Sequence, residues 1–208
     1  MNKILVRPIV SMLSFLLILG IFPLQAGSAA QTDPHVQKLI GKIIGSLKAA
    51  ERPGASEKKK ASLRNKMAAS MDQLLLSGPS SAEAIQSLLF PKLQKGSEEE
   101  VLLLGALLRH PVGIVARQAA GRLRDAGPKA AGALPDLLTY LRGVCATQKG
   151  NELNVNGFPA IIKKIGEPAV PFLVEAMGDS SSCVRQNIIA ALEEIPSEDA
   201  RAAVKRFR

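Results

Sequence analysis

Few side chains in this sequence belong to the types that carry out chemistry. It has two histidines, His35 and His110, and two cysteines, Cys145 and Cys183. The histidines have no neighbouring His–Glu pair or cysteine, so they do not form a set of ligands for a catalytic metal. Neither cysteine and no serine has a recognisable base beside it, and Gly-rich phosphate loops are absent. The sequence therefore predicts no catalytic residue, no metal, no cofactor and no enzyme activity. His110 precedes Pro111 and is expected to cap a helix end or to face water.

The amino-acid composition restricts the kinds of ligand that the protein is expected to recognise. Of the 208 residues, 47% are hydrophobic and 22% charged, which is typical of a folded domain. Aromatic residues make up 3%, with Tyr140 as the single tyrosine and no tryptophan. This scarcity argues against recognition by aromatic stacking, as in carbohydrate and single-stranded nucleic acid sites. The formal net charge is +9.

The first thirty residues have the pattern of an export signal. Lys3 and Arg7 precede an apolar stretch at residues 9–24, and the small residues Ser28 and Ala30 follow it. A basic start, a short apolar region and a small-residue exit are the parts of a secretory signal peptide. We expect residues 1–30 to be a signal peptide cleaved near Ala30, which predicts a periplasmic or secreted protein. The alternative is that the segment is retained as a membrane anchor.

The rest of the chain shows helical periodicity and no convincing strand pattern. Asp33 and Pro34 form a helix start, and an apolar stripe with helical spacing follows at Val36, Leu39, Ile40, Ile43, Ile44 and Leu47. After a polar connection at residues 51–60, we expect a helix carrying Leu63 to Leu75 and another at residues 81–90. Residues 31–95 are thus predicted to be an N-terminal helical region. A helix at residues 98–108 is apolar almost all round and should be buried.

From residue 98 onward the sequence repeats itself. The pattern Leu134-Pro135-Asp136-Leu137-Leu138 returns 36 residues later as Val170-Pro171-Phe172-Leu173-Val174. A second pattern relates Ile161, Ile162 and Ile165 to Ile188, Ile189 and Leu192, and Gly-Pro or Gly-Glu-Pro signals separate the units. A period of this length predicts an all-α solenoid, a right-handed α–α superhelix in which each helix pair buries its apolar face against its neighbours.

The repeated segment resembles a known family. The run Ile165-Gly166-Glu167-Pro168-Ala169-Val170-Pro171, continued by Asp179, Val184-Arg185 and Ala190-Ala191-Leu192, is similar to a HEAT repeat, closest to the bacterial phycobilisome-lyase-type HEAT-like repeats. The resemblance covers residues 98–208 and implies three such repeats, with the partner on the concave face formed by the second helix of each pair. It also implies that Asp179 and Arg185 brace the repeat. The middle repeat departs from the pattern, because Val155-Asn156 stands where Val184-Arg185 is expected.

The turn of the middle repeat is nine residues longer than the next one and rich in Gly and Asn. It is either a site of partner contact or a neutral insertion. Cys145 lies in this turn and Cys183 in the corresponding turn of the next repeat. Since stacked repeats place equivalent turns side by side, we expect a Cys145–Cys183 disulfide, with the long turn supplying the slack to close the gap. Two free thiols are the alternative.

Together these features indicate an exported scaffold that binds an unidentified protein and performs no catalysis. By analogy with HEAT-like lyases, one alternative is an accessory to a tetrapyrrole (bilin) lyase. Another is a binder of anionic membrane surfaces that uses the basic residues Lys58, Lys59, Lys60, Arg64 and Lys66. Export argues against nucleic acid as a partner, so none is predicted. The alternative for these cations is a solvated face.

Overall fold

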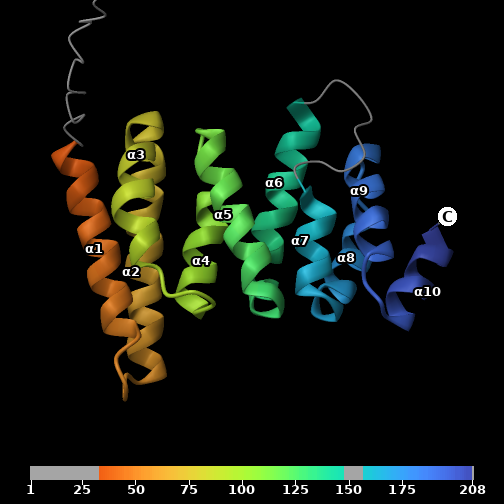
Figure 1. Cartoon of the computed structure of the whole chain (residues 1–208), viewed down its shortest axis with the longest axis horizontal. Coiled ribbons are helices and arrows are strands. Elements are labelled where there is room, and N and C mark those ends of the chain that lie inside the picture. The colour runs from red at the N-terminus through yellow and green to blue at the C-terminus, as the bar shows by residue number, and fades with distance from the viewer. Residues whose placement is uncertain (1–32, 148–156, 208) are drawn as a thin grey trace, which may run out of the picture. The chain divides into compact units, whose positions relative to one another are not determined.

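The computed structural model describes residues 33–147 and 157–207, and they fall within one unit, Thr32–Arg208. The predicted signal peptide therefore lies outside the described residues. Within them the chain is helical and has no strand (Figure 1). The longer helices are α1 (Pro34–Ala50), α2 (Glu57–Leu76), α4 (Glu98–Leu107), α5 (Gly113–Ala126), α6 (Leu134–Thr147), α7 (Phe158–Ile165), α8 (Val170–Ala176), α9 (Ser182–Glu193) and α10 (Glu198–Phe207).

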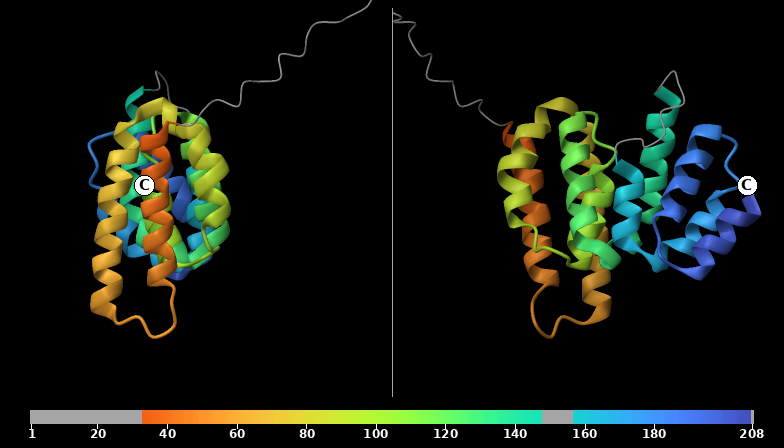
Figure 2. Two further views of the ribbon diagram at one scale, coloured as in Figure 1. Left: turned by 90° about the vertical axis from the view of Figure 1, so that its left-hand side faces the viewer. Right: turned by 45° about the vertical axis from the view of Figure 1, so that its right-hand side comes forward.

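The first two helices form an antiparallel hairpin (Figure 2). The carboxylate of Asp33 caps α1 by accepting the backbone N–H of His35 at 2.8 Å. The second helix begins at Glu57, earlier than the sequence indicates, because Ser56 caps it through the backbone N–H of Lys59. Its first turn is polar and lysine-rich, so the apolar periodicity that marks the rest of the helix is missing there.

A composite helical segment spans residues 78–92, where a single helix at 81–90 is expected. It consists of 3-10 turns at η2 (Gly78–Ser81) and η4 (Phe90–Lys92), with α3 (Ala82–Ala84) and the π-helical turn η3 (Ile85–Leu89) between them. Each 3-10 turn contains a proline, whose missing N–H and fixed φ interrupt regular α-helix at both ends. The segment packs against α1 through α3 and η3, and against α2 through η2.

From α4 onward the helices follow in the order α4 to α10. Helix α4 packs against α5 and α8 against α9, whereas α7 packs mainly against α5 and α9. The second helices α5, α7 and α9 contact one another in that order, and more extensively than α4, α6 and α8 do. Helix α5 ends at Gly127 and helix α7 ends at Gly166, and these glycines have φ of 61° and 76°. Both glycines lead into proline-containing 3-10 turns, η5 (Gly127–Ala133) and η7 (Glu167–Ala169). The Gly-Pro signals of the sequence thus mark where one helix pair ends and the next begins.

A single apolar core runs through these helices, from Val36 in α1 to Val204 in α10. As expected, α4 is largely buried, but Leu102 on it is 40% exposed. Two of its acidic residues, Glu99 and Glu100, are buried instead. Each has a cationic partner: Glu99 pairs with Arg64 of α2, and Glu100 lies beside Arg122 of α5.

Candidate functional site

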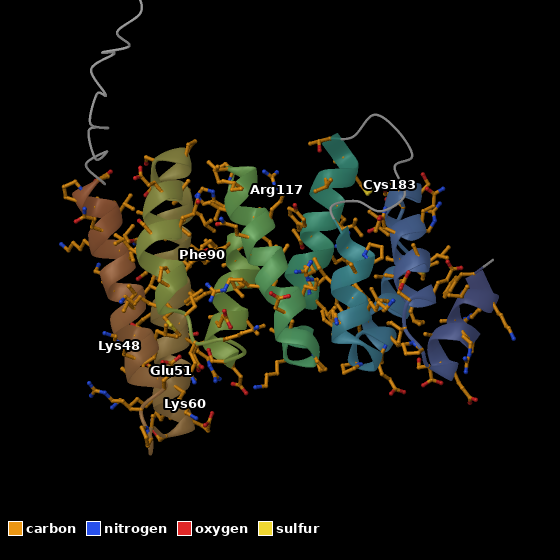
Figure 3. All side chains as sticks on the ribbon, in the orientation of Figure 1. Lys48, Glu51, Lys60, Phe90, Arg117 and Cys183 are labelled. Atoms are coloured by element: carbon orange, nitrogen blue, oxygen red, sulfur yellow. A yellow bond between two sulfur atoms is a disulfide. The ribbon has the colours of Figure 1, made fainter. Side chains whose placement is uncertain are left out.

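The structure brings the two cysteines together. Cys145 and Cys183 form a disulfide, with sulfur atoms 2.06 Å and Cα atoms 5.8 Å apart. The prediction that Cys145 lies in the long turn is wrong, because α6 continues to Thr147 and carries Cys145 in its last turns. Cys183 lies in the first turn of α9 (Figure 3). The distance between the two neighbouring repeats is therefore bridged by the extra length of α6, not by the long turn. Helix α6 has 14 residues where α8 has 7. The Gly/Asn-rich residues 148–156 lie outside the described part of the chain.

Asp179 and Arg185 both stabilise the turn between α8 and α9, through different atoms. The guanidinium of Arg185 donates to the backbone carbonyls of Asp179 and Ser180, at 2.7 and 2.9 Å. The carboxylate of Asp179 accepts the backbone N–H of Ser181 at 2.9 Å and pairs with Arg142 of α6 at 2.6 Å. The Ser181 hydrogen bond and then Arg142 lower the pKa of Asp179. Arg185 thus braces its own repeat, whereas Asp179 also ties that repeat to the previous one.

A cleft of about 720 Å³ opens between the α4–α5 turn and the outer part of α6. Its volume falls in the range of ligand and peptide sites. Its walls are mainly apolar, and two arginines stand among them. The lining residues are Leu108, Arg109, His110, Pro111, Gly113, Ala116, Arg117, Thr139, Tyr140, Gly143, Val144 and Thr147.

His110 is a fixed part of this cleft rather than a free base. It is 4% exposed and therefore does not face water, and α5 has no side-chain cap hydrogen bond. Its Nδ1 accepts the backbone N–H of Val112 at 3.1 Å, so the proton sits on Nε2. Nε2 lies 3.0 Å from the hydroxyl of Ser81, which itself donates to the carbonyl of Gly78. Burial lowers the pKa of His110, and the neutral ring has both nitrogens engaged.

The arginines give the cleft a positive rim. Arg117 forms no ion pair within the described residues. Its guanidinium lies over Gly113, where a Cβ would be 3.2 Å from Nη1 (Figure 3). Arg109 is only loosely paired, with 3.7 Å between Nη2 and the carboxylate of Asp72. An apolar group that carries a negative charge is therefore the occupant that this cleft complements.

A second cluster, which the sequence did not reveal, joins the end of the composite segment (η4) to α4 and α5. Glu100 is 1% exposed, and its Oε2 accepts the backbone N–H of Gly96 at 2.5 Å. Its Oε1 lies 3.1 Å from Nε of Arg122 but outside hydrogen-bond alignment. Arg122 also donates to the carbonyl of Phe90 at 2.7 Å, and its guanidinium carbon lies 5.5 Å from the centre of that ring (Figure 3). The charge of Arg122 compensates that of Glu100, although Oε1 accepts no hydrogen bond, and we interpret the cluster as structural.

Two of the five residues of the predicted basic patch form ion pairs with carboxylates in the same region. Arg64 binds the carboxylates of both Glu98 and Glu99, and Lys60 binds Glu57 at 2.9 Å. The patch at residues 58–66 is therefore partly neutralised. Lys58, Lys59 and Lys66 remain exposed.

No protein-family model, curated protein or solved structure matches this chain. Among residues 33–147 and 157–207, no group of three or more His, Cys, Asp or Glu side chains is placed to hold a metal ion. Over the same residues, no helix combines the length and the apolar character needed to cross a membrane. The site is therefore interpreted from its own geometry.

Proposed function

We propose that this protein is an exported helical-repeat scaffold that binds a segment of another protein and performs no catalysis. The observation that carries the proposal is the cleft between the α4–α5 turn and α6, apolar inside and rimmed by Arg109 and Arg117. Apolar pockets flanked by arginines are typical anchoring points in protein interfaces. The segment it complements carries a large apolar side chain next to a carboxylate.

The fold assignment is part of the same proposal. The succession of helix pairs, with α5, α7 and α9 in contact along one side, supports a HEAT-like right-handed solenoid over residues 98–208. The proposed binding site lies at the edge formed by the turns and the outer part of α6. It thus differs from the concave face of second helices that the resemblance implies.

Export is supported by the cysteine pair. Disulfides persist in oxidising compartments such as the periplasm and the extracellular space, and are rare in the cytosol. The basic and then apolar character of residues 1–30 supports the same conclusion.

Site-specific photocrosslinking tests the site and the function together. A benzophenone amino acid replaces Tyr140, and the chain is illuminated in the cells that produce it. Gly143→Trp is expected to fill the cleft and abolish the crosslink, because a side chain at Gly143 has open space around it. Arg117→Glu should weaken the crosslink by removing the charge that attracts the carboxylate.

Gly121→Trp is the matched control. Gly121 is also a mid-helix glycine with open space around its Cβ position, and it does not line the cleft. The proposal is wrong if Gly121→Trp removes the crosslink as completely as Gly143→Trp, or if Gly143→Trp leaves it intact.

A further inference from the structure

Positive charge is concentrated in the α1–α2 hairpin. Residues 33–76 contain nine Lys and Arg against four Asp and Glu, a net charge of +5. Residues 77–208 contain sixteen against fourteen, a net charge of +2. The hairpin is the first of the helix pairs, so its outer side is not covered by a preceding pair within the described residues.

The outer side of α1 carries three of these cations. Lys38, Lys42 and Lys48 are exposed, and they lie opposite the stripe that α1 buries. No acidic residue occurs between Asp33 and Glu51. None of the three lysines forms an ion pair within the part of the chain that the structure describes. We call Lys38, Lys42 and Lys48, with Gly41 and Gly45 between them, the α1 face.

The α1 face is smooth. A Cβ at Gly41 or Gly45 would meet no atom within 4 Å, so no side chain covers the backbone there. The exposed large apolar side chains of the described residues are Leu76, Leu88, Leu102, Ile114 and Phe207, and none lies on α1. Protein interfaces rely on buried apolar and aromatic anchors, which this face lacks. Cations standing on a flat strip instead complement an extended anionic surface.

We propose that the α1 face binds an anionic lipid membrane surface, with the lysine ammonium groups at the lipid phosphates. This surface is separate from the cleft, so a scaffold that uses both would hold its protein partner at the membrane. Each lysine near such a surface contributes about fivefold to binding, so the three together contribute about a hundredfold.

Vesicle sedimentation of the full-length chain tests this. Vesicles contain phosphatidylglycerol and phosphatidylcholine, or phosphatidylcholine alone, which reports any binding due to the apolar residues 9–24. The triple variant Lys38→Gln, Lys42→Gln, Lys48→Gln should bind the anionic vesicles about a hundredfold more weakly. Raising the salt concentration should weaken the binding of the unchanged chain.

A matched triple variant changes the net charge equally elsewhere: Lys129→Gln, Lys164→Gln, Lys205→Gln, all exposed and outside the hairpin. It should bind within about threefold of the unchanged chain. Equal loss in both triple variants would show that net charge, not the α1 face, governs binding and would overturn the proposal. So would equally tight, lysine-dependent binding to polyglutamate, which would assign the α1 face to an acidic polypeptide.

Discussion

Replacing Arg122 with methionine tests whether the buried ion pair between α4 and α5 stabilises the molecule as its geometry indicates. Methionine keeps the length and the apolar stem of the side chain but removes the guanidinium. Glu100 would then keep a carboxylate that is 1% exposed and has only the Gly96 amide as a partner. The hydrogen bond to the carbonyl of Phe90 would be lost as well.

The expected cost is about 3 kcal/mol. Removing one partner of a fully buried ion pair costs about 3–5 kcal/mol, because the remaining charge is left without compensation. The side chain of Arg122 is 31% exposed, so solvent already screens the pair and the lower end of that range applies. The free energy of unfolding of a domain is about 5–15 kcal/mol, so this loss is large enough to measure accurately.

Urea unfolding followed by circular dichroism measures the effect in a double-mutant cycle. Glu100→Gln removes the charge while its amide oxygen can still accept the Gly96 N–H. In that background Arg122→Met no longer strands a charge. The two substitutions together should therefore cost about 2 kcal/mol less than their separate effects predict.

Arg124→Met is the control on the same helix. Arg124 pairs with Asp125 at the surface, and both side chains are about half exposed, so the substitution should change stability by less than about 0.5 kcal/mol. Additive energies in the Glu100–Arg122 cycle would refute the reasoning, because they would mean that the two side chains do not interact in the folded protein.

Three further predictions concern the cysteines, the buried histidine and a close contact between helices. Reducing the Cys145–Cys183 disulfide, which closes a loop of 38 residues, should lower the unfolding free energy by about 3–4 kcal/mol in urea titrations with and without reductant; equal midpoints would contradict this. The pKa of His110 is lowered in the folded state, so the unfolded chain binds the extra proton and stability should fall as the pH drops below about 6.5. His110→Phe should flatten the dependence of the unfolding free energy on pH between pH 7 and 5. His35→Gln, at an exposed histidine, should leave that dependence unchanged. Gly105→Ala should destabilise by about 1 kcal/mol although alanine favours helix, since its Cβ would lie 2.6 Å from Oδ2 of Asp136. Asp136→Ala in the same variant should restore stability, and a stabilised single variant would show that the carboxylate moves aside freely.

The helices of the repeats could be predicted because their apolar residues recur at helical spacing and glycine and proline mark their ends. Gly127 and Gly166, for example, both adopt positive φ at the end of a helix. The start of α2 could not be located, because a lysine-rich first turn has no apolar residues to reveal its periodicity. The extension of α6 through Cys145 could not be predicted either, because it leads into residues that are typical of a turn.

Charged residues were the least predictable part of the site. Three successive glutamates at the start of α4 are typical of a solvated first turn that favours the helix dipole. The charge of the buried Glu100 is compensated by Arg122, which comes from the next helix, α5. The buried ring of His110 likewise meets Ser81, from a segment 29 residues earlier. Such pairings arise from the tertiary fold and leave no periodic signal.

The position of α6 connects the stability of the repeats to the shape of the cleft. Arg142 and Cys145 attach one side of this helix to the following repeat, through Asp179 and Cys183. Gly143, Val144 and Thr147, from the same turns, line the cleft on its other side. One ion pair and one disulfide therefore hold the outer part of α6 from the side away from the cleft, in addition to the packing of Tyr140 and Val144 against the core. A change that loosens either link should alter the cleft while leaving the buried core of the repeats intact, because the core residues of α6 end at Leu141.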